Sequence, residues 1–210
     1  MTNLASGISS QNVLLPEDVI VLQEFITHAE QETLLRWASD MEPELRPNGR
    51  GRQYSKIETL STVPEIYQTV RLRLQDVMNL GSRVVQEPQF GWYLSVIRSA
   101  GAIHEHIDNA PIGCRHLRCN LFLQLPAAGG MPIIKRQIIG VTERSLLAFF
   151  PNERRHASEA VAGDRDRIIL SFGYLAPATF LLPEMDHGSP ICINSVSDVA
   201  LTADLASARA

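Results

Sequence analysis

The sequence predicts a mainly β protein with N-terminal helices, folded as an antiparallel sandwich or jelly roll. Two segments with helical periodicity occur before residue 81, and the pattern then changes to short apolar runs separated by glycine and proline. Seven of these runs have the length and composition of strands. Strands that follow helices in this order are typical of two packed sheets with helices covering one of them.

The N-terminal part is expected to supply one strand and two helices. The strand spans residues 19–25, and the helices span residues 28–41 and 64–80. The second helix has Pro64 in its first turn and ends just before Gly81. Its apolar residues occupy a broad face, so we assign this helix to packing and not to chemistry.

A loop is expected between the two helices, at residues 42–56. It contains prolines and glycines together with the cations Arg46, Arg50, Arg52 and Lys56. A segment of this kind is ordinarily a solvated surface loop. The alternative is a lid that attracts an anionic ligand, and the sequence leaves both interpretations open.

The C-terminal part is expected to hold the β core. Its seven strands are predicted at residues 90–97, 102–107, 117–125, 131–139, 145–150, 156–161 and 167–175. We expect a single domain over residues 1–210, with the first strand and supporting helices in 1–86, the jelly-roll core in 87–176 and an extension in 177–210. Residues 1–15 are expected to be loose, and the tail at 201–210 to form at most a short helix.

Composition narrows the expected partners and location. The chain of 210 residues carries a net charge of −4, which gives no general attraction to nucleic acid or to anionic membranes. Its three cysteines have no metal-binding spacing, which favours a reducing compartment over a disulfide scaffold or a zinc ribbon. Neither a secretory signal nor a membrane-spanning run is recognisable, so we expect a cytoplasmic protein. The sequence predicts no oligomeric state.

Three potential metal ligands occur within five residues, at His104, His106 and Asp108. On an extended segment alternate side chains share a face, so His106 and Asp108 point the same way. His156 lies 48 residues after Asp108 and opens another predicted strand. Two imidazoles and one carboxylate on one face of a site form the facial triad of non-haem iron(II) oxygenases, which leaves positions open for substrate and dioxygen.

An alternative metal site uses His104 and His106 as a His-x-His pair of the cupin type. Cupins place a glutamate four or five residues after the second histidine, where this chain has Ala110 and Pro111. We therefore favour His106 and Asp108 as ligands, with His104 beside them on the substrate side.

Two arginines that follow His156 are candidate anchors for an anionic cosubstrate. Arg165 and Arg167 lie nine and eleven residues after this histidine, and Arg167 opens an apolar strand. A guanidinium held on a buried strand can bind a carboxylate through two charge-assisted hydrogen bonds. Each such bond contributes roughly 1.5–3 kcal/mol.

The combination of His106, Asp108, His156 and Arg167 resembles the iron(II)- and 2-oxoglutarate-dependent oxygenases, in particular their prolyl-hydroxylase-like branch. The resemblance covers about residues 93–174. It implies a double-stranded β-helix core. It also implies an iron(II) ion held by the triad, with dioxygen as the oxidant.

The same resemblance implies a binding site for 2-oxoglutarate. Arg167 matches the arginine that binds the distal carboxylate of this cosubstrate, and Arg165 remains the alternative anchor because some members have a shorter spacing. Gln124 stands about where many relatives carry a cosubstrate-binding tyrosine, so it is a further candidate for this site.

The activity implied by the resemblance is that of a dioxygenase that hydroxylates a small molecule, an amino acid or a peptide side chain and releases succinate and carbon dioxide. Nucleic-acid demethylases of the family carry an asparagine two residues after the cosubstrate arginine and an arginine six residues after it. This chain has Ile169 and Gly173 at these positions, so we do not expect a nucleic-acid substrate. Two other functions stay open: a cupin-like metalloenzyme that works without 2-oxoglutarate, and a non-catalytic jelly-roll module that binds an anionic or sugar-like ligand.

Candidate substrate-binding residues are Arg118, Asn120 and His104. Arg118 and Asn120 share the polar face of the strand predicted at residues 117–125. If this face turns inward, both residues line the substrate pocket; if it faces solvent, they are surface residues, and the sequence favours neither arrangement. His116 is expected to be exposed at a strand end.

Overall fold

The computed structural model of the chain describes residue 16 and residues 18–49 and 51–184. The loose terminus predicted at residues 1–15, the short helix considered for 201–210, and Arg50 all lie outside the described residues. No helix within the described part of the chain is long and apolar enough to cross a membrane.

The described residues form two α-helices, two short 3-10 helices and thirteen strands. The helices are α1 (His28–Asp40), α2 (Glu65–Val77), η1 (Glu42–Glu44) and η2 (Ile57–Thr59). The strands are β1 (Val19–Leu22), β2 (Arg46–Pro47), β3 (Arg52–Lys56), β4 (Val85–Gln86), β5 (Trp92–Ile97), β6 (Cys114–Gln124), β7 (Ala128–Gly129), β8 (Pro132–Ile134), β9 (Gln137–Ile138), β10 (Leu146–Phe149), β11 (His156–Ser158), β12 (Val161–Ala162) and β13 (Arg167–Pro177).

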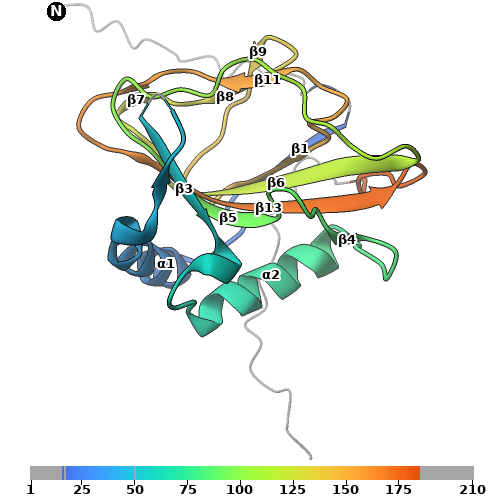
Figure 1. Ribbon diagram of the computed structural model, residues 1–210, viewed down its shortest axis with the longest axis horizontal. Coiled ribbons are helices and arrows are strands. Elements are labelled where there is room, and N and C mark those ends of the chain that lie inside the picture. The colour runs from blue at the N-terminus through green and yellow to red at the C-terminus, as the bar shows by residue number, and fades with distance from the viewer. Residues whose placement is uncertain (1–15, 17, 50, 185–210) are drawn as a thin grey trace, which may run out of the picture.

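One large antiparallel sheet organises the molecule. Its strand order is β1-β10-β6-β13-β5-β3-β2, with β4 paired to β13, and two smaller sheets contain β11-β8-β9 and β12-β7. Figure 1 shows α1 and α2 beneath the large sheet and β8, β9 and β11 above it. The predicted fold class is confirmed: a mainly β chain with N-terminal helices and a double-stranded β-helix (jelly roll) core.

Helix α1 begins at a capping box. The side chain of Thr27 accepts a hydrogen bond from the backbone N–H of Glu30, and the Glu30 carboxylate accepts one from the N–H of Thr27. The same carboxylate binds Arg73 of α2 at 2.6 Å. The first turn of α1 is therefore fixed both by its own cap and by the neighbouring helix.

The strands of the large sheet alternate between a helix-facing side and an interior side. On β6, Leu117, Cys119 and Leu121 belong to the apolar core that includes the helices. Phe122 belongs instead to a second core with Ile134 of β8, on the opposite side of the sheet. Since side chains alternate along a strand, the polar face of β6 points to the interior between the sheets.

Three sequence-based predictions of secondary structure were wrong. The strand predicted at residues 131–139 is a hairpin in which β8 pairs with β9. Residues 42–56 are not a loop, because β3 is an internal strand that pairs with β5 and with β2. The sequence of β3, Arg-Gln-Tyr-Ser-Lys, has polar residues on both sides of the strand, so it lacks the alternation of apolar and polar residues expected of a buried strand. Residues 102–107 form no strand; only His106 makes an isolated bridge to β11.

Burial of Leu34 on α1 should contribute strongly to stability. This side chain is fully buried (0% exposed) in the core between the helices and the large sheet, whereas Leu72 of α2 is 57% exposed. We expect Leu34→Ala to lower the free energy of unfolding by about 2–5 kcal/mol through lost burial and a residual cavity. The matched variant Leu72→Ala should change it by less than about 0.5 kcal/mol. Urea denaturation measures both, and equal effects would contradict the assigned packing.

Candidate metal centre

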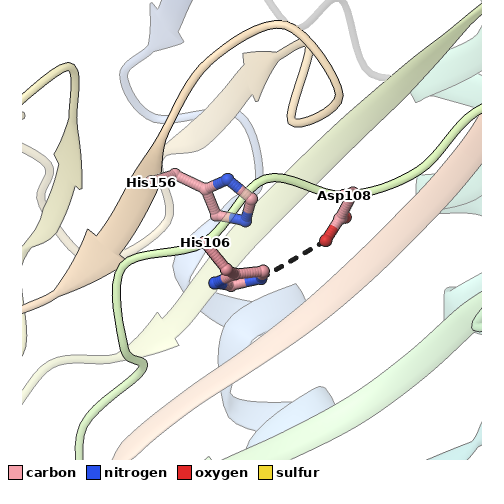
Figure 2. Close-up of side chains that lie close together, drawn as sticks. All are labelled: His106, Asp108 and His156. Atoms are coloured by element: carbon pink, nitrogen blue, oxygen red, sulfur yellow. Dashed lines mark ion pairs between the residues drawn. The ribbon is translucent and has the colours of Figure 1, made fainter.

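His106, Asp108 and His156 converge on one point at the open edge of the jelly roll. One potential ligand atom from each residue lies within 4.8 Å of the other two. Figure 2 shows the three side chains directed toward one another, with His156 at the start of β11 and the other two on the irregular segment that precedes β6. The structure therefore brings together the three ligands predicted from the sequence.

Backbone hydrogen bonds hold the irregular segment in place. The N–H of His106 donates to the carbonyl of His156 at 3.0 Å, and the N–H of His156 donates to the carbonyl of His106 at 3.0 Å. The N–H of Asp108 donates to the carbonyl of Pro151 at 3.0 Å. The segment that holds His106 and Asp108 is thus bonded directly to the segment around His156, although the two are far apart in the sequence.

Both histidine rings are oriented by a backbone carbonyl at Nδ1. Nδ1 of His106 lies 2.7 Å from the carbonyl oxygen of His104, and Nδ1 of His156 lies 3.1 Å from the carbonyl oxygen of Arg154. Because a carbonyl only accepts hydrogen bonds, each Nδ1 carries a proton, and Nε2 of the neutral His156 ring keeps its lone pair. Nε2 of His106 lies 3.3 Å from Oδ1 of Asp108, to which it donates when the ring is protonated, and it has a lone pair for a metal ion once this proton is lost. This is the tautomer in which Nε2 can bind a metal ion, with the ring held by its other nitrogen.

The charges at the three residues suit a divalent cation. Burial alone would raise the pKa of Asp108, but the hydrogen bond with His106 and the positive surroundings lower this pKa to about 2. Burial, and then the neighbouring His106, lower the pKa of His156 below its usual range. At neutral pH the cluster therefore offers an anionic carboxylate and a neutral imidazole, both in the states that metal binding requires.

Two buried side chains, His116 and Arg118, lie near Asp108. Nδ1 of His116 lies 3.4 Å from Oδ2 of Asp108 without forming a hydrogen bond, and its Nε2 lies 2.9 Å from Nη2 of Arg118. Arginine only donates, so Nε2 accepts and the proton of His116 faces Asp108. Arg118 also donates to the carbonyl of Gly91 at 3.0 Å and lies 3.6 Å from the Glu87 carboxylate.

The expectation that His116 is exposed was wrong, because this residue is 1% exposed. Its burial was hard to predict, since a histidine at a strand end usually reaches solvent. A recognisable signal would have been its place two residues before Arg118 on the interior side of the same strand. His116 lies beside the candidate ligand Asp108, and the charge of Arg118 acts to lower the pKa of this carboxyl group.

The histidines should titrate in a defined order in the metal-free protein. Burial and the adjacent Arg118 lower the pKa of His116 to about 4, whereas the hydrogen bond with Asp108 raises the pKa of His106 above 6.5. The unfolded chain binds a proton at His116 near pH 6.5 that the folded protein binds only near pH 4. The contribution of His116 to the free energy of unfolding therefore rises with pH across this interval.

NMR titration of the imidazole resonances measures this order directly. We expect the His106 signals to move above pH 6.5 and those of His116 to stay unchanged until the pH falls well below 6. A His116 midpoint at or above 6.5 would contradict the buried contact with Arg118.

Arg167 is the other unusual charge in the interior. It is 2% exposed, and its Nε and Nη1 atoms have no hydrogen-bond partner within the described residues. Its guanidinium lies 5.2 Å from the centre of the Phe122 ring. Burial, and then the charge of Arg52, lower the pKa of Arg167 to about 10, so it remains cationic at neutral pH. A buried cation without a partner is costly, which fits a site that an anion completes.

Two small cavities border the triad. One of about 190 Å³ is lined by Asn48, Gly49, Arg52, Ala102, Ile103, His104 and His106. The other, of about 110 Å³, is lined by Glu87, Gln89, Phe90, Ile107, Asp108, Asn109 and His116. Space for small molecules is therefore present on both sides of the candidate ligands.

Comparison with known proteins gives matches to solved structures alone: no family model matches the sequence, and neither does any curated protein. The viral collagen prolyl hydroxylase of Paramecium Bursaria Chlorella virus-1, solved as a 2-oxoglutarate complex, matches with a TM-score of 0.59 and 15% identity over 76% of this chain and 97% of that chain. A prolyl hydroxylase from Trichoplax adhaerens, in complex with a peptide fragment of hypoxia inducible factor, matches with a TM-score of 0.61 and 12% identity over 75% and 83%. HygX from Streptomyces hygroscopicus, with nickel, 2-oxoglutarate and hygromycin B bound, matches with a TM-score of 0.58 and 14% identity over 80% and 86%.

The chain has the fold of the 2-oxoglutarate-dependent oxygenases. Within this oxygenase fold, the structure separates the two candidate anchor arginines. The side chain of Arg165 is 48% exposed and lies 2.8 Å from the carboxylate of Glu143, whereas Arg167 is buried without an acidic partner. Gln124 uses its Nε2 to donate to the carbonyl of Asp166 at 2.9 Å.

The residues predicted to bind substrate occupy different places in the oxygenase fold. His104 lines the larger cavity beside the triad. Asn120 points to the interior, where its Oδ1 accepts a hydrogen bond from Ser171 at 2.7 Å. Arg118 also points to the interior, but its guanidinium is occupied by His116 and Gly91.

Proposed function

We propose that the chain is an iron(II)- and 2-oxoglutarate-dependent dioxygenase that oxidises a small molecule, an amino acid or a peptide side chain, with release of succinate and carbon dioxide. The observation that carries the proposal is the coexistence, in this fold, of a two-histidine, one-carboxylate cluster with a buried arginine that lacks a partner. The cluster suits iron(II), and the buried arginine suits a carboxylate of 2-oxoglutarate. We propose further that residues 1–210 act as a single domain in the cytoplasm.

The donor set fits iron(II). Nε2 of His106, Nε2 of His156 and a carboxylate oxygen of Asp108 form the two-histidine, one-carboxylate combination, which leaves coordination positions open on the same ion. When bound, iron(II) would supply the site at which dioxygen is activated. The chain's own contribution is to fix the ring orientations through His104 and Arg154.

The interior charge fits the distal carboxylate of 2-oxoglutarate. Arg167 points into the space between the sheets with free donors at Nε and Nη1, and Phe122 covers one face of its guanidinium. A planar guanidinium binds a carboxylate with two parallel hydrogen bonds, and burial excludes the water that would compete for them. This role requires a cation that no protein carboxylate neutralises, which distinguishes Arg167 from Arg165.

The similar structures suggest the range of substrates. One was solved with a peptide fragment and another with hygromycin B. The same fold therefore accommodates both peptides and small molecules, and specificity in such folds depends on the loops around the site.

Arg167→Gln should weaken 2-oxoglutarate binding while leaving metal binding intact. Loss of a single charge-assisted hydrogen bond corresponds to about a 10- to 100-fold higher dissociation constant. Equilibrium dialysis of labelled 2-oxoglutarate against the metal-loaded protein measures this change, and succinate release under air measures turnover in the same samples.

Arg165→Gln is the matched control, because it removes an exposed arginine two residues away. We expect its dissociation constant for 2-oxoglutarate to stay within about threefold of the unchanged protein, as for a surface ion pair. Equal loss in both variants would reject Arg167 as the anchor. Metal binding without any 2-oxoglutarate binding would support the cupin-like enzyme, and absence of both would support the non-catalytic module.

A further inference from the structure

Arg52 of β3 lies on the interior side of the large sheet, in the same cross-strand row as Arg167. It pairs with Ile97 of β5, and Ile97 pairs in turn with Arg167 of β13. Directly paired residues point to the same side of a sheet, and neighbouring strands are about 4.8 Å apart. The Cα atoms of the two arginines are thus separated by two strand spacings, about 10 Å.

The guanidinium of Arg52 extends from this row toward the candidate metal centre. Its Nε donates to Oγ of Ser95 at 3.2 Å, and its Cζ lies 5.2 Å from the ring centre of Tyr54 and 5.4 Å from that of Tyr93. The residue also lines the 190 Å³ cavity together with His104 and His106. Arg52 therefore faces the space next to the ligand His106, with an aromatic surface beneath it.

No carboxylate neutralises Arg52 among the described residues. Ser95 is the only hydrogen-bond partner of its side chain there, so both terminal nitrogens keep free donors. Arg98, which follows β5 nearby, is paired with both Glu42 and Asp166. Arg98 thus has two acidic partners, whereas Arg52, beside the cavity, has none among the described residues.

The backbone holds Arg52 in this position. The N–H of Arg52 donates to the carbonyl of Gly49 at 2.9 Å, and the N–H of Arg98 donates to the carbonyl of Gly51 at 2.9 Å. Gly51 has φ +71°, and a Cβ there would lie 3.1 Å from the Cα of Gly101, so this turn fits closely against the segment that leads to the metal ligands. The backbone of Arg52 is consequently held in place at the wall of the cavity.

We infer that Arg52 binds an oxyanion of the substrate, a carboxylate or a phosphate, in the cavity beside His106, so that the substrate carries an anionic group. The inference rests on the proposed function, because it assigns Arg167 to 2-oxoglutarate and leaves Arg52 for the second anion. Burial, and then the charge of Arg52, lower the pKa of Arg167 to about 10, which places Arg52 within electrostatic reach of this arginine. The cavity of about 190 Å³ has room for a carboxylate or phosphate group beside Arg52.

The experiment uses the protein loaded with zinc(II) and saturated with 2-oxoglutarate, so that Arg167 is occupied. Acetate, inorganic phosphate and acetamide are added separately, and binding is followed by NMR of the arginine Nε–H groups and of the backbone amides of β3 and β5. We expect acetate or phosphate to shift the signals of Arg52 and Ser95, and the neutral acetamide to leave them unchanged. The tighter of the two anions identifies the substrate group as a carboxylate or a phosphate.

Arg52→Gln should weaken binding of the preferred anion at least about 10-fold, whereas Arg52→Lys should retain part of it because the charge is kept. Arg36→Gln is the control: this exposed arginine lies on α1, on the opposite side of the large sheet, and should leave anion binding unchanged. The affinity for 2-oxoglutarate should be unaffected by Arg52→Gln.

Three results would overturn the inference. These are equal shifts with acetate and acetamide, anion binding that survives in Arg52→Gln, and a loss of 2-oxoglutarate affinity in Arg52→Gln as large as in Arg167→Gln. If the protein fails to bind 2-oxoglutarate, the proposed function fails separately. The same anion titration in the Arg167→Gln variant then isolates Arg52 and decides the inference by itself.

Discussion

The antiparallel bridge between His106 and His156 is the interaction on which the candidate site depends. Its two backbone hydrogen bonds join an irregular segment to β11 and thereby place ligands separated by fifty residues at one point. The bond from Asp108 to Pro151 extends the same junction to the third ligand. Because backbone groups make these bonds, the position of the ligands depends on the fold of the jelly roll and only weakly on the identity of nearby side chains.

Buried charge is the second organising feature. Glu87, Arg118 and His116 form a continuous chain of contacts that ends at the carboxylate of Asp108. The two charged groups in this chain of contacts, Glu87 and Arg118, lie 3.6 Å apart, as burial of charge requires. Arg167 and Arg52 are different, since neither has an acidic partner among the described residues. The charges of Glu87 and Arg118 therefore compensate each other near Asp108, whereas Arg167 and Arg52 are cations without acidic partners and suit anionic ligands.

The sequence predicted the β-rich fold, the three ligand candidates and two candidate anchors, because strand alternation is a local property and the spacing of the ligands can be counted along the chain. It could not choose between Arg165 and Arg167, since both spacings are allowed and only burial separates them. It missed β3 because that strand has polar residues on both sides, so its pattern looked like a charged loop. It also placed His116 at the surface, because the neighbours of this residue come from other segments. These are the irregular segment that holds Asp108 and the loop before β5.

The central claim is that one ion held by His106, Asp108 and His156 is chelated by 2-oxoglutarate in this fold. The most direct measurement is visible absorption during anaerobic addition of iron(II) and then 2-oxoglutarate to the protein. The account predicts a weak charge-transfer band that appears only when both are present and saturates at one iron(II) per chain. Absence of the band, with no succinate formed after air is admitted, would contradict it.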